Sequence, residues 1–151
     1  MLLWRISNHA TLDGSGGLYA AGRWHTRGRP ILYTSQNPST ALLEVLVHLE
    51  IDPEDRPANF RLLKIEAPET ISRQTLDPTR LDPAWQENPE DQSLTQAIGD
   101  AWLAHARTLL LEVPSVLVPE TWNILINPLH PQASLLRIVS VYDHPFDPRL
   151  E

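Results

Sequence analysis

One acidic side chain stands among aliphatic neighbours in the segment Ala-Leu-Leu-Glu-Val-Leu-Val-His, where the glutamate is Glu44. A carboxylate is costly to bury as a charge unless it is paired. A surface pair between Glu44 and His48, one helical turn apart, is the plain interpretation, and it stabilises a helix by only about 0.2–0.5 kcal/mol. The alternative places Glu44 on the wall of a cleft, where a fixed negative charge stabilises a cationic transition state.

The residues before this glutamate form a basic, glycine-rich window. No Asp or Glu occurs from Gly14 through Leu43, whereas Arg23, Arg27 and Arg29 do, together with most of the chain's six glycines. The planar fork of arginine matches a phosphate or carboxylate with two parallel hydrogen bonds, and glycine lets a ligand approach the backbone closely. The window therefore indicates a site for a small anion. An ordinary surface charge is the alternative for Arg23.

The combination of an anion-binding arginine with one carboxylate suits the cleavage of a bond at a sugar carbon, because the transition state of that reaction resembles an oxocarbenium ion. NAD offers both matching parts, a diphosphate and a ribose carbon bonded to a positively charged nicotinamide. Arg23 would then hold phosphate, and Glu44 would favour the cationic sugar. A non-catalytic binding module, in which Arg23 and Glu44 merely pair across the core, remains open on the residues alone.

Composition and missing motifs argue against several other classes of site. The chain has 12 basic and 19 acidic residues, and this net charge of −7 is a poor balance for an RNA-binding or RNA-cutting protein. It has no cysteine, so disulfides and thiolate ligands are excluded. No H-x-x-x-H, dinucleotide-binding glycine motif, P-loop or serine elbow occurs, and no metal site is expected. Without a leader or a membrane-length apolar run, we expect a cytoplasmic protein.

The elements that must position these residues form an α+β pattern, in a single domain over residues 1–151. Strands are predicted at residues 4–6, 31–34, 60–65, 109–113, 116–118, 124–126 and 135–142. One helix is predicted from Pro38 to Leu49 with Asn37 as its N-cap, and because it is apolar nearly all round we expect it to be deeply buried. A second helix is predicted from Pro89 to about Arg107 with Asn88 as its N-cap, after an irregular stretch at 67–92.

Three strings resemble the RES domain, the toxin half of RES–Xre toxin–antitoxin systems. They are GGLYAAGRWHTRGRPILYTS, ALLEVLVHLE and VPSVLVPETWNILINPLHP, and the likeness runs from Trp4 to about Val141. The resemblance implies a fold similar to that of ADP-ribosyltransferases, with short, mostly antiparallel strands around a cleft and two main helices. It also implies degradation of NAD, as a substrate and not a cofactor, by hydrolysis or phosphorolysis, with growth arrest as the outcome. The nearest rival function is transfer of ADP-ribose to a protein.

The resemblance also assigns catalytic residues. The arginine, glutamate and serine that name the family match Arg23, Glu44 and Ser115, and a family tyrosine matches Tyr33. The family role of Tyr33 is a stacking surface for nicotinamide, whereas packing in the core with a bonded hydroxyl is the plain alternative. For Ser115, donation of a hydrogen bond to ribose or phosphate is favoured over action as a nucleophile, because no histidine is placed to activate it. A simple turn residue is the alternative.

Further substrate-binding residues and partners follow from the same likeness. The arginine of the first strand corresponds to Arg5, whose alternative is solvent exposure, and Ser93 and Asn123 are additional candidates. An Xre-type DNA-binding antitoxin is the expected partner, with its C-terminal part blocking the NAD cleft, and the toxin is expected to form a homodimer. No direct contact with nucleic acid or membrane is expected.

Overall fold

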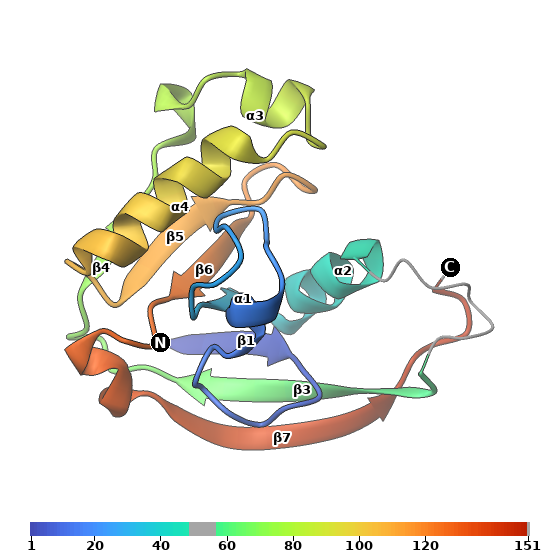
Figure 1. The fold of residues 1–151 in the computed structure, drawn as a ribbon. Coiled ribbons are helices and arrows are strands. Elements are labelled where there is room, and N and C mark those ends of the chain that lie inside the picture. Colours follow the sequence, from blue (N-terminus) through green and yellow to red (C-terminus); the bar gives the residue numbers. More distant parts are fainter. Residues whose placement is uncertain (49–56, 151) are drawn as a thin grey trace.

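The computed structural model describes residues 1–48 and 57–150. Within them the strands form a seven-stranded sheet in the order β4-β5-β6-β2-β1-β3-β7 (Figure 1). The strands are β1 (Leu2–Ile6), β2 (Leu32–Ser35), β3 (Asn59–Glu66), β4 (Arg73–Thr75), β5 (Leu110–Pro114), β6 (Trp122–Ile126) and β7 (Arg137–Pro145). Neighbouring strands are antiparallel except β4 and β5, which are parallel. The expected α+β fold with mostly antiparallel strands is confirmed.

Two longer helices accompany the sheet, α2 (Pro38–His48) and α4 (Ser93–His105). Short elements are α1 (Gly16–Tyr19), α3 (Ala84–Glu87), η2 (Pro78–Arg80) and η3 (Pro131–Leu135). In Figure 1, α4 lies along β5, whereas α2 lies beside the other part of the sheet; it contacts β1 and β2. None of the described helices is long and apolar enough to span a bilayer.

The predicted start of α2 is confirmed in detail. The side-chain oxygen of Asn37 accepts hydrogen bonds from the backbone N–H of Thr40 at 2.9 Å and from its hydroxyl at 3.1 Å. This is the bonding of an N-cap, followed here by proline at the first helical position. The predicted end of the helix at Leu49 lies outside the described residues.

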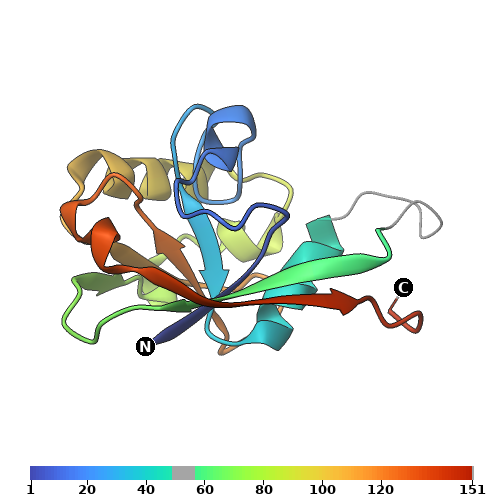
Figure 2. The same ribbon diagram turned by 90° about the horizontal axis from the view of Figure 1, so that it is seen from below.

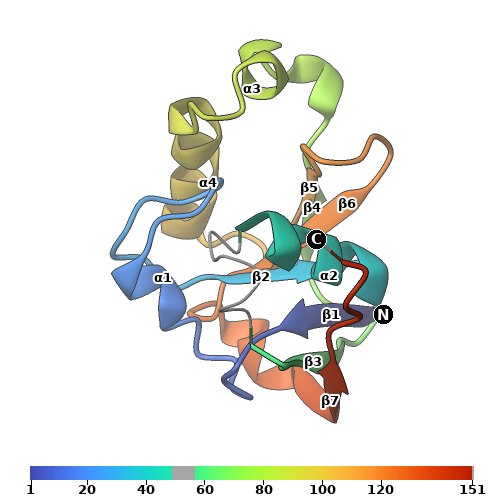
Figure 3. The same cartoon turned by 90° about the vertical axis from the view of Figure 1, so that its right-hand side faces the viewer.

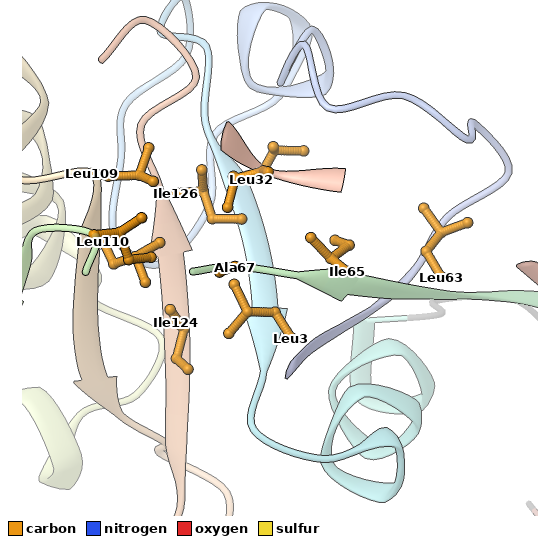
Figure 4. Packing of buried hydrophobic residues seen from close by; sticks show 11 residues of the cluster. Leu3, Leu32, Leu63, Ile65, Ala67, Leu109, Leu110, Ile124 and Ile126 are labelled. Carbon is orange, nitrogen blue, oxygen red and sulfur yellow. The ribbon is translucent and has the colours of Figure 1, made fainter. Parts of the chain in front are cut away.

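Apolar side chains pack on both faces of the central strands. Leu110, Ile124 and Ile126 belong to one buried cluster, which also contains Leu3, Leu32, Leu63 and Ile65 (Figure 4). Leu111, Val113 and Leu125 belong to a second cluster that includes Trp24 and Trp102. Because successive residues of β5 and β6 enter opposite clusters, a shift of register by one residue would exchange the two faces. Burial on both faces therefore fixes the register of these strands, and with it the positions of the residues that they carry.

The strands β1 and β2 barely pair with each other. β1 follows β3 over its whole length, from Leu2↔Glu66 to Ile6↔Leu62, but it meets β2 only at Trp4↔Ser35. Figure 2 shows β3 and β7 running together away from the other strands, and Figure 3 shows α2 across the region of β1 and β2. The single β1–β2 contact leaves side chains beyond it free to line a cavity.

Two helix predictions are wrong. α2 is not deeply buried: Leu43 is 38% and Val47 is 54% exposed, because only one side of the helix faces the sheet. α4 begins at Ser93 rather than at Pro89, since Asn88 instead caps the C-terminal end of α3 by donating its N–H to Ala84.

Two loop regions also differ from the prediction. Residues 116–118 form a bend rather than a strand, because the hydroxyl of Ser115 accepts the N–H of Leu117 at 3.1 Å and the N–H of Ser115 donates to Thr121. Such local hydrogen bonds compete with strand pairing. The stretch 67–92, predicted as irregular, contains β4, η2 and α3. The unpredicted strand is β4, which has three exposed residues and therefore no apolar alternation to reveal it.

Candidate active site

A cavity of about 320 Å³ lies where β1 and β2 part. These two strands, α2 and the chain around α1 line it. Its volume is at the lower end of the range of ligand pockets. Five candidates from the sequence line it, namely Arg5, Arg23, Tyr33, Glu44 and Asn123. The tertiary fold therefore brings the arginines and the carboxylate, which are distant in sequence, to one hollow.

Arg5 enters the cavity from β1 instead of facing solvent. Its Nη1 donates to the backbone carbonyl of Tyr33 at 3.2 Å, while its Nε is buried without a hydrogen-bond partner among the described residues. Burial lowers the pKa of Arg5, an effect that the negative charge of Asp13 partly offsets. The guanidinium remains cationic at any physiological pH. Its Nε–H therefore has an unmet capacity to donate, in a cationic group that lines the cavity.

Arg23 reaches the same cavity from the loop between α1 and β2. Its Nη2 donates to the carbonyl of Pro89 at 3.1 Å, and the hydroxyl of Thr95 donates to the carbonyl of Arg23 itself. Burial lowers the pKa of Arg23, and Glu44 and Tyr33 oppose that shift. Its Nη1 is buried, and like Nε of Arg5 it has no partner in the part of the chain that the structure describes. Buried N–H groups in native proteins nearly always have a partner, so these two indicate a place for an anionic ligand.

The Tyr33 hydroxyl ties the Arg23 loop to the sheet. It accepts the N–H of Trp24 at 3.1 Å and lies 2.7 Å from Nδ1 of His25, whose Nε2 lies 2.9 Å from the carbonyl of Ala20. A carbonyl only accepts, so Nε2 carries a proton, and in the neutral ring Nδ1 then accepts from the hydroxyl. Burial raises the pKa of Tyr33 well above its usual value. Tyr33 thus remains protonated, and its hydroxyl is hydrogen-bonded to the two residues that follow Arg23.

We expect Tyr33→Phe to lower the free energy of unfolding by about 1–3 kcal/mol, because the N–H of Trp24 and Nδ1 of His25 lose their shared partner. Urea unfolding followed by circular dichroism measures the change. Tyr142→Phe is the matched control, since Tyr142 is 48% exposed on β7, and it should shift the free energy by less than about 0.5 kcal/mol. Equal stability of the two variants would contradict this structural role of the hydroxyl.

Glu44 is held in place by hydrogen bonds from two side chains that lie far from it in the sequence. Its Oε1 accepts hydrogen bonds from Oγ of Ser115 at 3.0 Å and from Nδ2 of Asn123 at 2.7 Å. His48 contacts the backbone carbonyl of Glu44 at 2.6 Å rather than the carboxylate. Among the described residues, no ion pair within 4 Å joins Glu44 to Arg23. The carboxylate is therefore fixed through one oxygen, and among the described residues no hydrogen bond or ion pair engages Oε2.

Some candidates lie elsewhere or in a different role. Ser93 does not line the cavity; its N–H and hydroxyl both bond to Asp91 at the start of α4. Ser115 lies behind Glu44 and is not part of the cavity wall. Of the arginines in the basic window, Arg29 is paired with Asp100 at 3.3 Å, and Arg27 is exposed and away from the lining.

His25 is a site residue that the sequence analysis did not single out. It is 2% exposed, lines the cavity and contacts the Tyr33 hydroxyl. An isolated histidine in a loop has no spacing pattern that would identify it. Across residues 1–48 and 57–150, no group of three His, Asp or Glu side chains is arranged to hold a metal ion.

The arrangement combines two functions in one hollow. Two arginines in the lining carry guanidinium groups suited to phosphate. A carboxylate in the same lining is fixed by hydrogen bonds to one oxygen, and a negative charge in a partly water-excluded place can stabilise a developing cation more than it would in water.

The chain is similar to several known proteins. A family model described as the RES domain matches residues 2–148. The chain is 51% identical over 150 residues to "Toxin Res" of Pseudomonas putida, covering 99% of both chains. It is 36% identical over 155 residues to "Prs ADP-ribosylating toxin" of a Sphingobium species, covering 97% of this chain and 94% of the relative. A chain in the crystal structure of the M. tuberculosis MbcT-MbcA toxin-antitoxin complex superposes with a TM-score of 0.78 at 18% identity, over 99% of this chain and 85% of that one.

Proposed function

Because this chain belongs to the RES domain family, we propose that it is the toxin of a toxin–antitoxin pair and that it depletes cellular NAD. The reaction breaks the bond between the nicotinamide nitrogen and C1 of its ribose. The electron pair of this bond leaves with nicotinamide. The oxygen of water or of phosphate then bonds to C1, and a proton is released to solvent.

The observation that carries this proposal is the shared cavity of Arg5, Arg23 and Glu44. The guanidinium groups of Arg5 and Arg23, whose Nε and Nη1 have no partner within residues 1–48 and 57–150, suit the diphosphate of NAD. Glu44 offers Oε2 to a hydroxyl of the nicotinamide-side ribose and favours the sugar as positive charge appears at C1. The bonds from Ser115 and Asn123 keep the carboxylate in place, so little reorganisation accompanies the reaction.

Tyr33 contributes a ring to the cavity in this proposal, and nicotinamide packs against it. The hydroxyl of Tyr33 is already committed to Trp24 and His25, so the ring and not the hydroxyl meets the ligand. In this proposal Ser115 and Asn123, which both donate to Glu44, act through it, and a direct bond from Asn123 to ribose is compatible with its place in the lining.

Transfer of ADP-ribose to a protein is the second candidate. The relative named "Prs ADP-ribosylating toxin" favours it. Both reactions begin with departure of nicotinamide, and they differ only in the group that attacks C1. The same residues therefore serve both, and the acceptor must be identified by experiment.

Incubating the purified chain with NAD labelled in its ADP-ribose half tests the proposal. We expect nicotinamide release and a small labelled product, ADP-ribose in water or its phosphate ester when phosphate is supplied. Addition of a cell lysate separates the two candidates, because label attached to protein indicates transfer. Absence of nicotinamide release under all of these conditions would overturn the proposal.

The proposed partner is an antitoxin of the Xre type whose C-terminal part occupies the NAD cavity, in an assembly that contains a toxin homodimer. Similarity to a chain from a toxin-antitoxin complex supports an antitoxin partner. A toxin that consumes cellular NAD would act in the cytoplasm. Light scattering of the isolated chain and of the co-expressed pair measures both assemblies.

A further inference from the structure

A relay of hydrogen bonds begins at the last residue of β2, one of the strands that line the cavity. Ser35, the last residue of β2, donates its hydroxyl to Oδ1 of Asn123 at 2.9 Å. Nδ2 of Asn123 in turn donates to Oε1 of Glu44 at 2.7 Å. Ser35 and Asn123 are register partners in the β2–β6 pair, and Ser35 is 3% exposed.

We propose that Ser35 is a positioning residue for Glu44, which acts by fixing the side-chain amide of Asn123. This inference rests on the proposed NAD cleavage for its kinetic consequence. The structural part, which is the orientation of one amide, stands independently of the reaction.

The geometry explains why a hydroxyl is needed at position 35. An asparagine amide has an acceptor oxygen at one end and a donor nitrogen at the other. The carboxylate of Glu44 accepts only, so the nitrogen must face it, and Oδ1 of Asn123 is then directed at Ser35. Without the hydroxyl, this oxygen lacks its donor in a largely buried place, which is costly. Rotation of the amide towards another donor then becomes favourable, because it would give Oδ1 a new hydrogen bond, and the bond from Nδ2 to Glu44 weakens.

The position of Glu44 depends on this bond because only one of its oxygens is fixed. Ser115 is the other donor to Oε1, and its own hydroxyl is anchored by the N–H of Leu117. Two donors from different segments define the plane of a carboxylate, whereas one permits it to swing. Displacements of about 1 Å at a reacting group are enough to lower rates about 100-fold. Partial loosening should therefore reduce kcat while leaving the arginine contacts to phosphate unchanged.

The test is Ser35→Ala in the full chain, with NAD as the substrate. We expect kcat for nicotinamide release to fall by about 10-fold with KM changed by less than about 2-fold. Asn123→Ala should lower kcat similarly or more, and adding Ser35→Ala to it should cause no further loss, because the relay is already broken. An unchanged kcat in Ser35→Ala, or full additivity with Asn123→Ala, overturns the inference.

Ser72→Ala is the matched control. Ser72 is half-buried, and like Ser35 it donates its hydroxyl to an amide oxygen, Oε1 of Gln132, at 2.6 Å, but it lies outside the cavity. It should reduce thermal stability to a similar extent without changing kcat. An equal loss of kcat in Ser72→Ala would assign the effect of Ser35 to general destabilisation and contradict a positioning role.

A second readout does not depend on activity. The Nδ2 protons of Asn123 are observed by NMR in ¹⁵N-labelled protein, and the proton bonded to the carboxylate should resonate downfield. Ser35→Ala should move it upfield, whereas Ser72→Ala should not.

Should the wild type fail to cleave NAD, the proposed function fails, and this resonance alone decides the inference. Should Ser35→Ala not fold, Ser35→Cys, with a weak donor of similar shape, should show the same displacement in smaller degree, and an unmoved resonance overturns the proposal.

Discussion

Glu44→Gln is expected to lower the rate of nicotinamide release by about 1000-fold, which corresponds to about 4 kcal/mol in the barrier. The glutamine oxygen still accepts from Ser115 and Asn123, so the shape of the site is retained. The group left facing the sugar is then a neutral amide in place of a charged oxygen, and the stabilisation of the oxocarbenium-like state is lost. Release of nicotinamide by the purified variant measures the effect.

Binding of NAD should be largely kept in Glu44→Gln, because the substitution removes an interaction that strengthens only as the bond breaks. Isothermal titration calorimetry compares its Kd with that of the wild type. Glu112→Gln is the control, since Glu112 lies on β5 beside Arg73 and outside the cavity, and it should have near-normal turnover. Near-normal turnover of Glu44→Gln would remove Glu44 from the mechanism.

Arg23→Gln is expected to weaken NAD binding by roughly 10- to 100-fold. Hydrogen bonds to charged groups contribute about 1.5–3 kcal/mol, and this substitution removes the cationic group whose Nη1 has no partner within the described protein. The loss should appear mainly in KM and in the Kd for NAD, because phosphate is bound both before and during bond breaking. Calorimetry and steady-state kinetics with NAD measure the two values.

Arg27→Gln is the matched control for this prediction. Arg27 belongs to the same acid-free window but is exposed and does not line the cavity. It should change the affinity by less than about 2-fold at physiological salt, where screening weakens exposed charges. Equal weakening by both substitutions would show that the window attracts NAD by its general charge and that Arg23 makes no specific contact.

Much of the local structure could be predicted because its causes are local. Asn37 and Pro38 set the start of α2 through bonds within four residues of each other, and the apolar runs of β5 and β6 identify buried strands. Local signals led to wrong predictions where a neighbouring group formed a competing hydrogen bond. Asn88-Pro89 has the sequence of a helix start, yet α3 uses Asn88 at its end, and the hydroxyl of Ser115 diverts residues 116–118 into a bend.

The sequence by itself determined the types of chemistry available: one carboxylate set in an apolar helix, arginines in an acid-free window, and the family that these strings resemble. Only the tertiary structure decided which groups meet. Ser115 and Asn123 lie 71 and 79 residues from Glu44 and reach it through the register of β5 with β6 and of β6 with β2. The same long-range packing drew Arg29 to Asp100 and left Ser93 outside the cavity. Hydrogen-bond partners across a sheet are set by strand order and by burial on both faces, which no local pattern encodes.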